Sequence, residues 1–128
     1  MRWYEDKTYH LMCEKAIEIQ ELWEMIEGDY YVNPRYGRHV VLSNPIILKD
    51  NRFWLPRQDQ LQRMIHLFEK DGEGCRWLVH KFKKFLEESD LEYVYTIEGS
   101  MEQLWLAFVM YENYQKVWKG NKWEVQNG

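Results

Sequence analysis

The spacing of apolar residues changes twice along this chain, and that change limits the folds open to it. From Asp6 to Ile26, apolar side chains recur every three or four residues, which is the period of one buried helix face. Residues 29–55 instead hold short β-prone runs, and all three prolines lie between residues 34 and 56. Helical spacing returns after residue 58. This order predicts an α+β fold.

The first helix should span Asp6 to Ile26 and end at Gly28. The residues expected on its buried face are Tyr9, Met12, Ala16, Ile19, Trp23 and Ile26. Short strands are then expected at 30–32, 38–42, 46–48 and 52–55, with residues 49–51 as a hairpin turn. Strands joined by such tight turns predict an antiparallel meander.

Pro56 stands where a second helix should begin, in a first turn that tolerates proline. Its apolar stripe is Leu61, Met64, Ile65 and Phe68. A third helix is expected from Cys75 to Glu87, with these residues buried: Cys75, Leu78, Val79, Phe82, Phe85 and Leu86. Residues 91–97 alternate as a strand does, and Ser100 with Gln103 has the spacing of a capping box. The predicted architecture is a small antiparallel sheet of three to five short strands packed with about four helices, in the order α-β-β-β-β-α-α-β-α.

The fourth helix is apolar on nearly every side. One stripe is Met101, Leu104, Trp105 and Phe108; a second is Ala107, Tyr111, Tyr114 and Trp118; a third is Leu106, Met110 and Val117. A helix of this kind is either central in the fold or packed against a second molecule. Both alternatives stay open: an enclosed helix, or a homodimer through this helix.

The 128 residues fit a single domain, residues 1–128. Aromatic residues make up 16% of the chain, which allows a small core to bury much surface. No apolar run approaches the roughly 20 residues that a membrane helix needs. The opening residues carry acids before any apolar stretch, unlike a signal peptide, so a cytoplasmic protein is expected.

No familiar catalytic motif occurs in the sequence, so we expect no catalytic residue, cofactor or metal. Cys13 and Cys75 both lie in apolar helical patterns and should be buried free thiols. His10 with Cys13 has a spacing that two metal ligands could use, but helices offer such pairs by chance. An acidic cluster could bind a divalent cation or simply be a solvated helix end; its members are Glu87, Glu88, Asp90 and Glu92. An enzyme with an unfamiliar site there remains an alternative.

Trp77 falls opposite the core stripe of the third helix, with Lys81 and Lys84 one and two turns later. An aromatic ring among cations suits base stacking with phosphate contacts. It equally suits packing of the indole under lysine stems. The net charge of −4 argues against broad electrostatic attraction to nucleic acid or to anionic membranes.

Charge is unevenly distributed along the chain. Residues 1–29 carry a net charge of −5, and residues 30–63 carry +4. The acidic first helix could balance the basic sheet, or the basic segment could meet an acidic partner.

The run from Trp54 to Gln62, with the segments 10–16 and 104–110, resembles a family of small uncharacterised proteins encoded by phages and prophages of Gram-positive bacteria. The later half is also similar to small phage α/β sandwich domains. The resemblance implies origin and assigns no catalytic residue. From the residues themselves, the run reads as a strand-to-helix junction, or as a surface where Arg57, Gln60 and Arg63 contact a partner.

The leading hypothesis from sequence is a non-catalytic phage or prophage accessory protein that binds a macromolecule, with protein more favoured than nucleic acid. The alternatives are a nucleic-acid-associated protein and an enzyme with an unrecognised site. The candidate binding residues are Arg57, Gln60, Arg63, Trp77, Lys81, Lys84, Tyr114 and Trp118.

Overall fold

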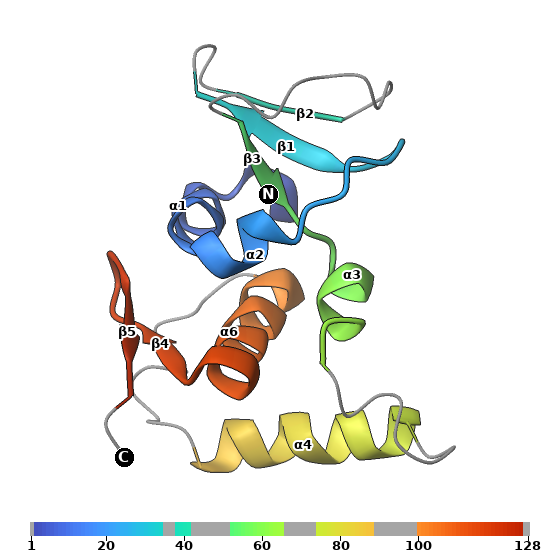
Figure 1. The fold of residues 1–128 in the computed structure, drawn as a ribbon, viewed down its shortest axis with the longest axis vertical. Coiled ribbons are helices and arrows are strands. Elements are labelled where there is room, and N and C mark those ends of the chain that lie inside the picture. Colours follow the sequence, from blue (N-terminus) through green and yellow to red (C-terminus); the bar gives the residue numbers. More distant parts are fainter. Residues whose placement is uncertain (1, 35–37, 42–51, 66–73, 89–99, 127–128) are drawn as a thin grey trace. The chain divides into compact units, whose positions relative to one another are not determined.

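The computed structural model describes residues 2–34, 38–41, 52–65, 74–88 and 100–126, with the backbone alone for 38–41. They form the expected combination of helices and short antiparallel strands (Figure 1). The chain groups into two compact units, residues 1–57 (unit 1) and residues 58–128 (unit 2). A single domain over residues 1–128 stays a prediction, because compact units of this size can fold separately or together.

Unit 1 begins with a short 3-10 helix η1 (Trp3–Glu5) and two helices, α1 (Lys7–Lys15) and α2 (Ile17–Glu21). Asp6 caps α1, since its Oδ1 accepts the Thr8 N–H at 2.8 Å. At Ala16 the backbone leaves the helical region, with φ −86° and ψ 74°. The single helix predicted from Asp6 to Ile26 is therefore wrong: it is interrupted at Ala16 and ends at Glu21.

The predicted buried face of this segment is correct except at its end. Tyr9, Met12, Ala16, Ile19 and Trp23 are buried, whereas Ile26 is 53% exposed. The reason is local hydrogen bonding after α2. The carboxylate of Asp29 accepts the Ile26 N–H and the Trp23 indole N–H, which holds residues 23–29 in a loop. Gly28 belongs to this loop, where its φ of +98° favours glycine.

Three strands form an antiparallel sheet in unit 1: β1 (Tyr30–Asn33), β2 (Arg38–Val41) and β3 (Phe53–Leu55). They confirm the strands predicted at 30–32, 38–42 and 52–55. The order is β2-β1-β3, so the described strands place β1 in the centre and differ from a sequential meander. Tyr31 lies opposite Val40 on one side and Trp54 on the other. The strand predicted at 46–48 and its turn at 49–51 lie outside the described residues.

Aromatic side chains pack the sheet of unit 1. Trp23 stacks parallel to Trp54, with centroids 6.2 Å apart and planes 2° apart, and also meets Tyr31 at 6.0 Å. The Tyr9 hydroxyl donates to the Pro56 carbonyl at 2.6 Å, which ties α1 to the residues after β3. Pro56 therefore joins strand to helix two residues before α3 begins, rather than standing inside its first turn.

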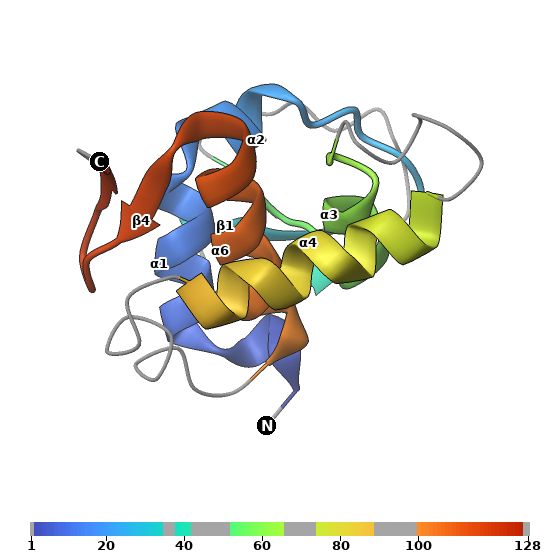
Figure 2. The same ribbon diagram turned by 90° about the horizontal axis from the view of Figure 1, so that it is seen from below.

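Unit 2 contains α3 (Gln58–Gln62), α4 (Gly74–Glu88) and α6 (Met101–Tyr114). α4 lies beside α6 in both ribbon views (Figures 1 and 2), and Phe82 stacks on Trp105 at 4.2 Å. α3 is shorter than expected, although Leu61 and Ile65 are buried as predicted. Phe68 and the strand predicted at 91–97 lie outside the described residues.

The buried stripe of α4 is narrower than predicted. Leu78 and Phe85 are buried, and Phe82 and Leu86 are partly buried. Cys75 and Val79 were expected inside, but Cys75 is exposed and Val79 is 63% exposed. Each residue turns the helix by about 100°, so Val79 points well away from its buried neighbour Leu78. The prediction that both cysteines are buried is therefore wrong for Cys75. Both thiols are free, as expected.

Ser100 caps α6 as predicted, because its Oγ accepts the Gln103 N–H at 3.1 Å. The helix ends earlier than expected, at Gln115, whose φ of 54° is left-handed. A hairpin follows that the sequence reasoning missed: β4 (Lys116–Trp118) and β5 (Trp123–Val125). Residues Trp105 to Met110 of α6 are buried on every side, which favours the central alternative for this helix.

Candidate functional site

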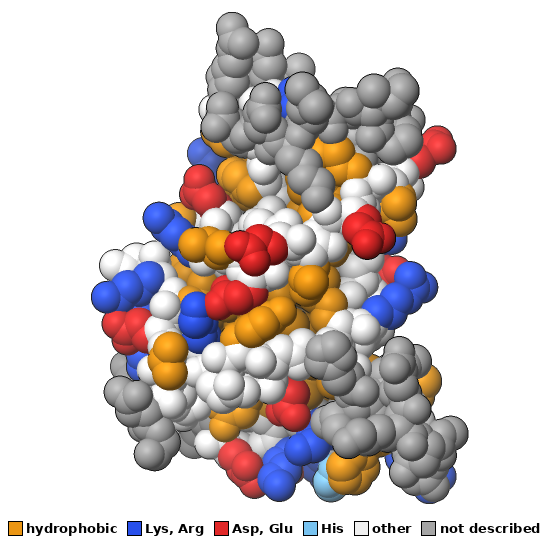
Figure 3. All heavy atoms as spheres, in the orientation of Figure 1, with side chains coloured by type: hydrophobic (Ala, Val, Ile, Leu, Met, Phe, Trp, Pro, Cys, Tyr) orange, Lys and Arg blue, Asp and Glu red, His pale blue; other side chains and the backbone are white. Residues whose placement is uncertain are grey.

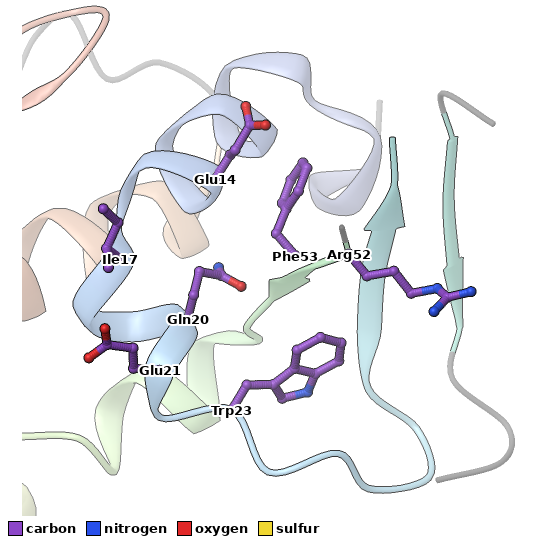
Figure 4. A pocket seen from close by; sticks show the side chains of 7 residues that line it. All are labelled: Glu14, Ile17, Gln20, Glu21, Trp23, Arg52 and Phe53. Atoms are coloured by element: carbon purple, nitrogen blue, oxygen red, sulfur yellow. The ribbon is translucent and has the colours of Figure 1, made fainter. Parts of the chain in front are cut away.

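A surface hollow of about 390 Å³ lies on unit 1, between α1–α2 and β3 (Figure 4). We call it the α2 hollow. Its size is within the range of sites that take a small molecule or a few side chains. The residues that line it are Glu14, Ile17, Gln20, Glu21, Trp23, Arg52 and Phe53.

Gln20 fixes the polar floor of the α2 hollow. Its Nε2 donates to the carbonyls of Cys13 and Trp54, both at 3.0 Å, and its Oε1 accepts the Trp54 N–H at 2.7 Å. The side chain thus binds both backbone groups of one residue of β3, as a neighbouring strand would. This amide is committed to holding α2 against the edge of β3, so it serves structure here.

Trp23 forms an apolar wall of the hollow, and Asp29 holds it there. The fully buried carboxylate of Asp29 accepts the Trp23 indole N–H at 3.0 Å and the Ile26 N–H at 3.1 Å. Arg57 lies 3.7 Å from the same carboxylate and donates to the Gly28 carbonyl at 3.2 Å. The buried charge is therefore paired and hydrogen-bonded, as buried carboxylates need to be.

The charges at the hollow are mainly negative. Figure 4 shows Arg52 extending away from Gln20 and Ile17, and its guanidinium lies over the Tyr31 ring at 5.9 Å. Glu14 and Glu21 are exposed, and within the described part of the chain neither makes an ion pair. Two carboxylates thus remain available at the rim.

Exposed apolar side chains accompany these acids. Ile17 is 64% exposed in the hollow itself, and Leu22 and Ile26 further along the chain are 50% and 53% exposed. Figure 3 shows hydrophobic, acidic and basic side chains interspersed over the face that it draws. An exposed apolar side chain in a hollow offers a partner a place to bury apolar surface.

The three residues predicted to form a binding face around the Trp54–Gln62 run fall in different settings. Arg57 belongs to unit 1 and is engaged with Asp29 and Gly28. Gln60 and Arg63 belong to unit 2, where Gln60 is partly buried and Arg63 is exposed, 3.9 Å from Asp59. The Arg57 contacts agree with the structural reading of this junction.

The predicted Trp77 cluster is brought together on α4. Trp77 is 40% exposed, His80 stacks on it at 5.4 Å, and the Lys81 ammonium lies 6.0 Å from its ring. Lys81 is also 3.8 Å from Glu112 of α6, whereas Lys84 is exposed. Part of this positive charge is therefore neutralised within the unit.

Tyr114 and Trp118 do not share the helical stripe that was predicted for them. Tyr114 is partly buried at the end of α6, and Trp118 is buried in β4, opposite Trp123 at 5.1 Å. The left-handed turn at Gln115 separates the two residues, so they form no common face on one helix.

The described residues contain no group of three or more side chains that could hold a metal ion. His10 Nε2 lies 2.7 Å from the Tyr4 carbonyl, and burial raises the pKa of the Cys13 thiol, which keeps it protonated. In the acidic cluster, Glu87 lies 3.9 Å from Lys83, and Asp90 and Glu92 fall outside the described residues.

None of the residues of the α2 hollow was among the binding residues predicted from sequence. One indication was present: Ile17 and Leu22 interrupt the acidic side of the first helical segment, off the buried stripe. The break at Ala16 and the loop held by Asp29 could not be read from periodicity, and both shape the hollow.

Comparison of the chain with protein-family models, with curated proteins and with solved structures finds no match. Among the described helices, none combines the length and apolar character needed to cross a membrane.

Proposed function

We propose that this chain is a non-catalytic accessory protein, of phage or prophage origin, that works by binding a partner protein in the cytoplasm. The observation that carries the binding proposal is the α2 hollow, an open apolar surface with carboxylates at its rim. The origin rests on the resemblance of the Trp54–Gln62 run, together with the segments 10–16 and 104–110.

The chemistry of the α2 hollow favours binding over catalysis. Its described lining residues include no Ser, Cys or His, and the amide among them, Gln20, is committed to the β3 backbone. Glu14 and Glu21 are exposed, so they suit the rim of a contact surface.

Site-specific crosslinking tests this proposal. A photoreactive phenylalanine placed at position 17 should crosslink a partner protein when the variant is expressed in cells of the bacterium that carries this gene. The same group placed at Lys83, exposed on α4 in unit 2, is the matched control. A discrete adduct from position 17 that position 83 does not give supports the proposal, and equal, diffuse labelling from both positions contradicts it.

A nucleic-acid-binding role for α4 is the second candidate, supported by the clustering of Trp77, His80 and Lys81. Titration with single-stranded DNA and RNA at low salt tests it, since phosphate contacts are strongest there. Binding that weakens when Lys81→Ala and Lys84→Ala are combined would favour this candidate over the first. The ion pair between Lys81 and Glu112 argues against this candidate, because Glu112 already neutralises one of the cations that would contact phosphate.

A homodimer through α6 has less support, because its residues from Trp105 to Met110 are buried within the chain. Sedimentation over a range of concentrations decides this point. A strict monomer at high concentration would contradict the homodimer. The α2 hollow would then be the contact surface that we propose.

A further inference from the structure

We propose that the α2 hollow binds a cationic amphipathic segment of its partner, with an aliphatic or aromatic side chain seated between flanking Lys or Arg residues. This inference rests on the proposed function and names the chemistry of the partner. It follows from the charges at the hollow, from the blocked edge of β3 and from the exposed apolar anchor.

The charge argument begins with the groups that face the hollow. Glu14 and Glu21 stand at the rim on the helical side, and Arg52 on the opposite side directs its guanidinium over Tyr31. Residues 1–29 carry a net charge of −5 and residues 30–63 carry +4, so the negative charge at the hollow comes from its rim and not from the unit as a whole. Complementary charge on a partner speeds association and disfavours acidic competitors.

The mode of binding follows from Gln20. A peptide that extends a sheet must pair with exposed N–H and C=O groups of an edge strand. At Trp54 both of these groups are already bonded to the Gln20 side chain. An added strand is therefore disfavoured on this edge of β3. The remaining mode of binding is insertion of a partner's side chains into the hollow.

The apolar anchor site is formed by Ile17, Trp23 and Phe53. Ile17 is largely exposed, Phe53 is partly buried, and Trp23 is held in place by Asp29. An aliphatic or aromatic side chain placed here would cover Ile17, and an adjacent Lys or Arg would reach a rim carboxylate. Long cationic side chains are suited to this, since their stems pack on apolar surface while the charge stays in water.

Two synthetic peptides provide the probes: a fluorescein-labelled amphipathic helix built from Leu and Lys, and its twin with Glu at every Lys position. Fluorescence anisotropy should show binding of the Leu–Lys peptide to the full chain and far weaker binding of the Leu–Glu peptide. The combined change Glu14→Gln with Glu21→Gln should weaken binding about tenfold at low salt, and less at high salt. The matched control is Glu24→Gln with Glu27→Gln, which removes the same charge from exposed sites outside the lining.

The outcomes separate this inference from the proposed function. A Leu–Lys peptide that fails to bind, a Leu–Glu peptide that binds equally well, or a control that weakens binding as much as the rim variant overturns the cationic partner. Ile17→Ser reports on the hollow itself, because this exposed side chain can change without disturbing the fold. If Ile17→Ser alone removes binding while the rim variant has no effect, the hollow remains a contact surface and its partner is apolar, not cationic.

Discussion

Asp29 holds the loop after α2 through interactions that the sequence does not reveal. Its buried carboxylate joins the Trp23 indole, the Ile26 N–H and the Arg57 guanidinium. Asp29→Ala should lower the free energy of unfolding by about 2–3 kcal/mol, because it leaves the buried Trp23 indole N–H without its acceptor and removes the carboxylate beside the Arg57 guanidinium. Asp29→Asn should cost less, since an amide oxygen can still accept from Trp23. Urea unfolding measures both changes.

The exposed Glu27 supplies the control for this experiment. Glu27→Ala removes a carboxylate from the same loop and should change stability by no more than about 0.5 kcal/mol. If it costs as much as Asp29→Ala, then net charge explains the effect and the buried hydrogen bonds do not.

The two cysteines should differ sharply in reactivity. Cys75 is exposed, whereas Cys13 is fully buried and burial raises the pKa of its thiol. Because the thiolate is the reactive form, one thiol per folded chain should react with Ellman's reagent, and the second only on unfolding. In Cys75→Ser the rapid phase should vanish. A rapid phase that survives this change would place Cys13 at the surface.

The same thiol should contribute to the alkaline limit of stability. The folded-state pKa of Cys13 lies above that of the unfolded chain, about 8.5. Its contribution is thus fully present below that pH and is lost as the pH rises, because only the unfolded chain then releases the proton. Thermal melts between neutral pH and pH ~10 should show a shallower decline for Cys13→Ala than for the wild type. Parallel declines would contradict the shift.

At the scale of elements, the joint between α2 and β3 depends on one amide. Gln20→Glu keeps the shape but removes both donors and places a carboxylate beside the carbonyls of Cys13 and Trp54. We expect a loss of about 2 kcal/mol at neutral pH, since two carbonyls lose their partner. The loss should shrink at acid pH, where the introduced carboxyl group is protonated and can donate again.

Chemical denaturation at neutral and acid pH measures this effect, with Gln126→Glu as the control. Gln126 is exposed, and its backbone N–H, which the substitution keeps, donates to the Gln115 carbonyl. The control should be nearly neutral at both pH values. A pH-independent loss in Gln20→Glu would mean that size, and not hydrogen bonding, determines the effect.

The sequence predicted those elements whose start, end or pairing follows from residue type and apolar spacing. It missed those that depend on individual side-chain contacts or on an unusual backbone conformation. The Ser100 cap and the strand around Tyr31 are set by neighbouring residues, and both were correctly expected. The loop after α2 was missed because apolar periodicity takes no account of the Asp29 carboxylate, which accepts from Ile26 and Trp23 and lies beside Arg57. The end of α6 was missed because Gln115, not Gly, adopts the left-handed conformation there. The hollow depends on the loop, so it could not be predicted either.

At the scale of the whole molecule, charge segregation along the chain is only partly explained by internal pairing. The ion pair between Arg57 and Asp29 links the acidic segment 1–29 to the basic segment 30–63, as one reading of the sequence expected. Glu14 and Glu21 lie outside that balance. The surplus of acids near the hollow is therefore available for a partner.

The prediction of a single domain concerns the whole chain and can be tested on it directly. A domain of about 60 residues buries only about 60% of the surface that its unfolded chain exposes, which leaves it marginally stable. Because each unit is close to that size, we expect both to unfold in one cooperative transition. Fluorine NMR of fluorotryptophan-labelled protein can follow Trp54 in unit 1 and Trp105 in unit 2 through a urea titration.

Trp54→Phe and Trp105→Phe assign the two resonances, and the native signals of both should then disappear with the same midpoint. Coincident midpoints mean that stability lost at Asp29 is felt throughout the chain, including at Trp105. Two separate midpoints contradict the single domain, and Asp29→Ala would then shift the Trp54 midpoint alone. The described residues that line the α2 hollow all belong to unit 1, so in that case its peptide binding should follow the Trp54 transition and not the Trp105 transition.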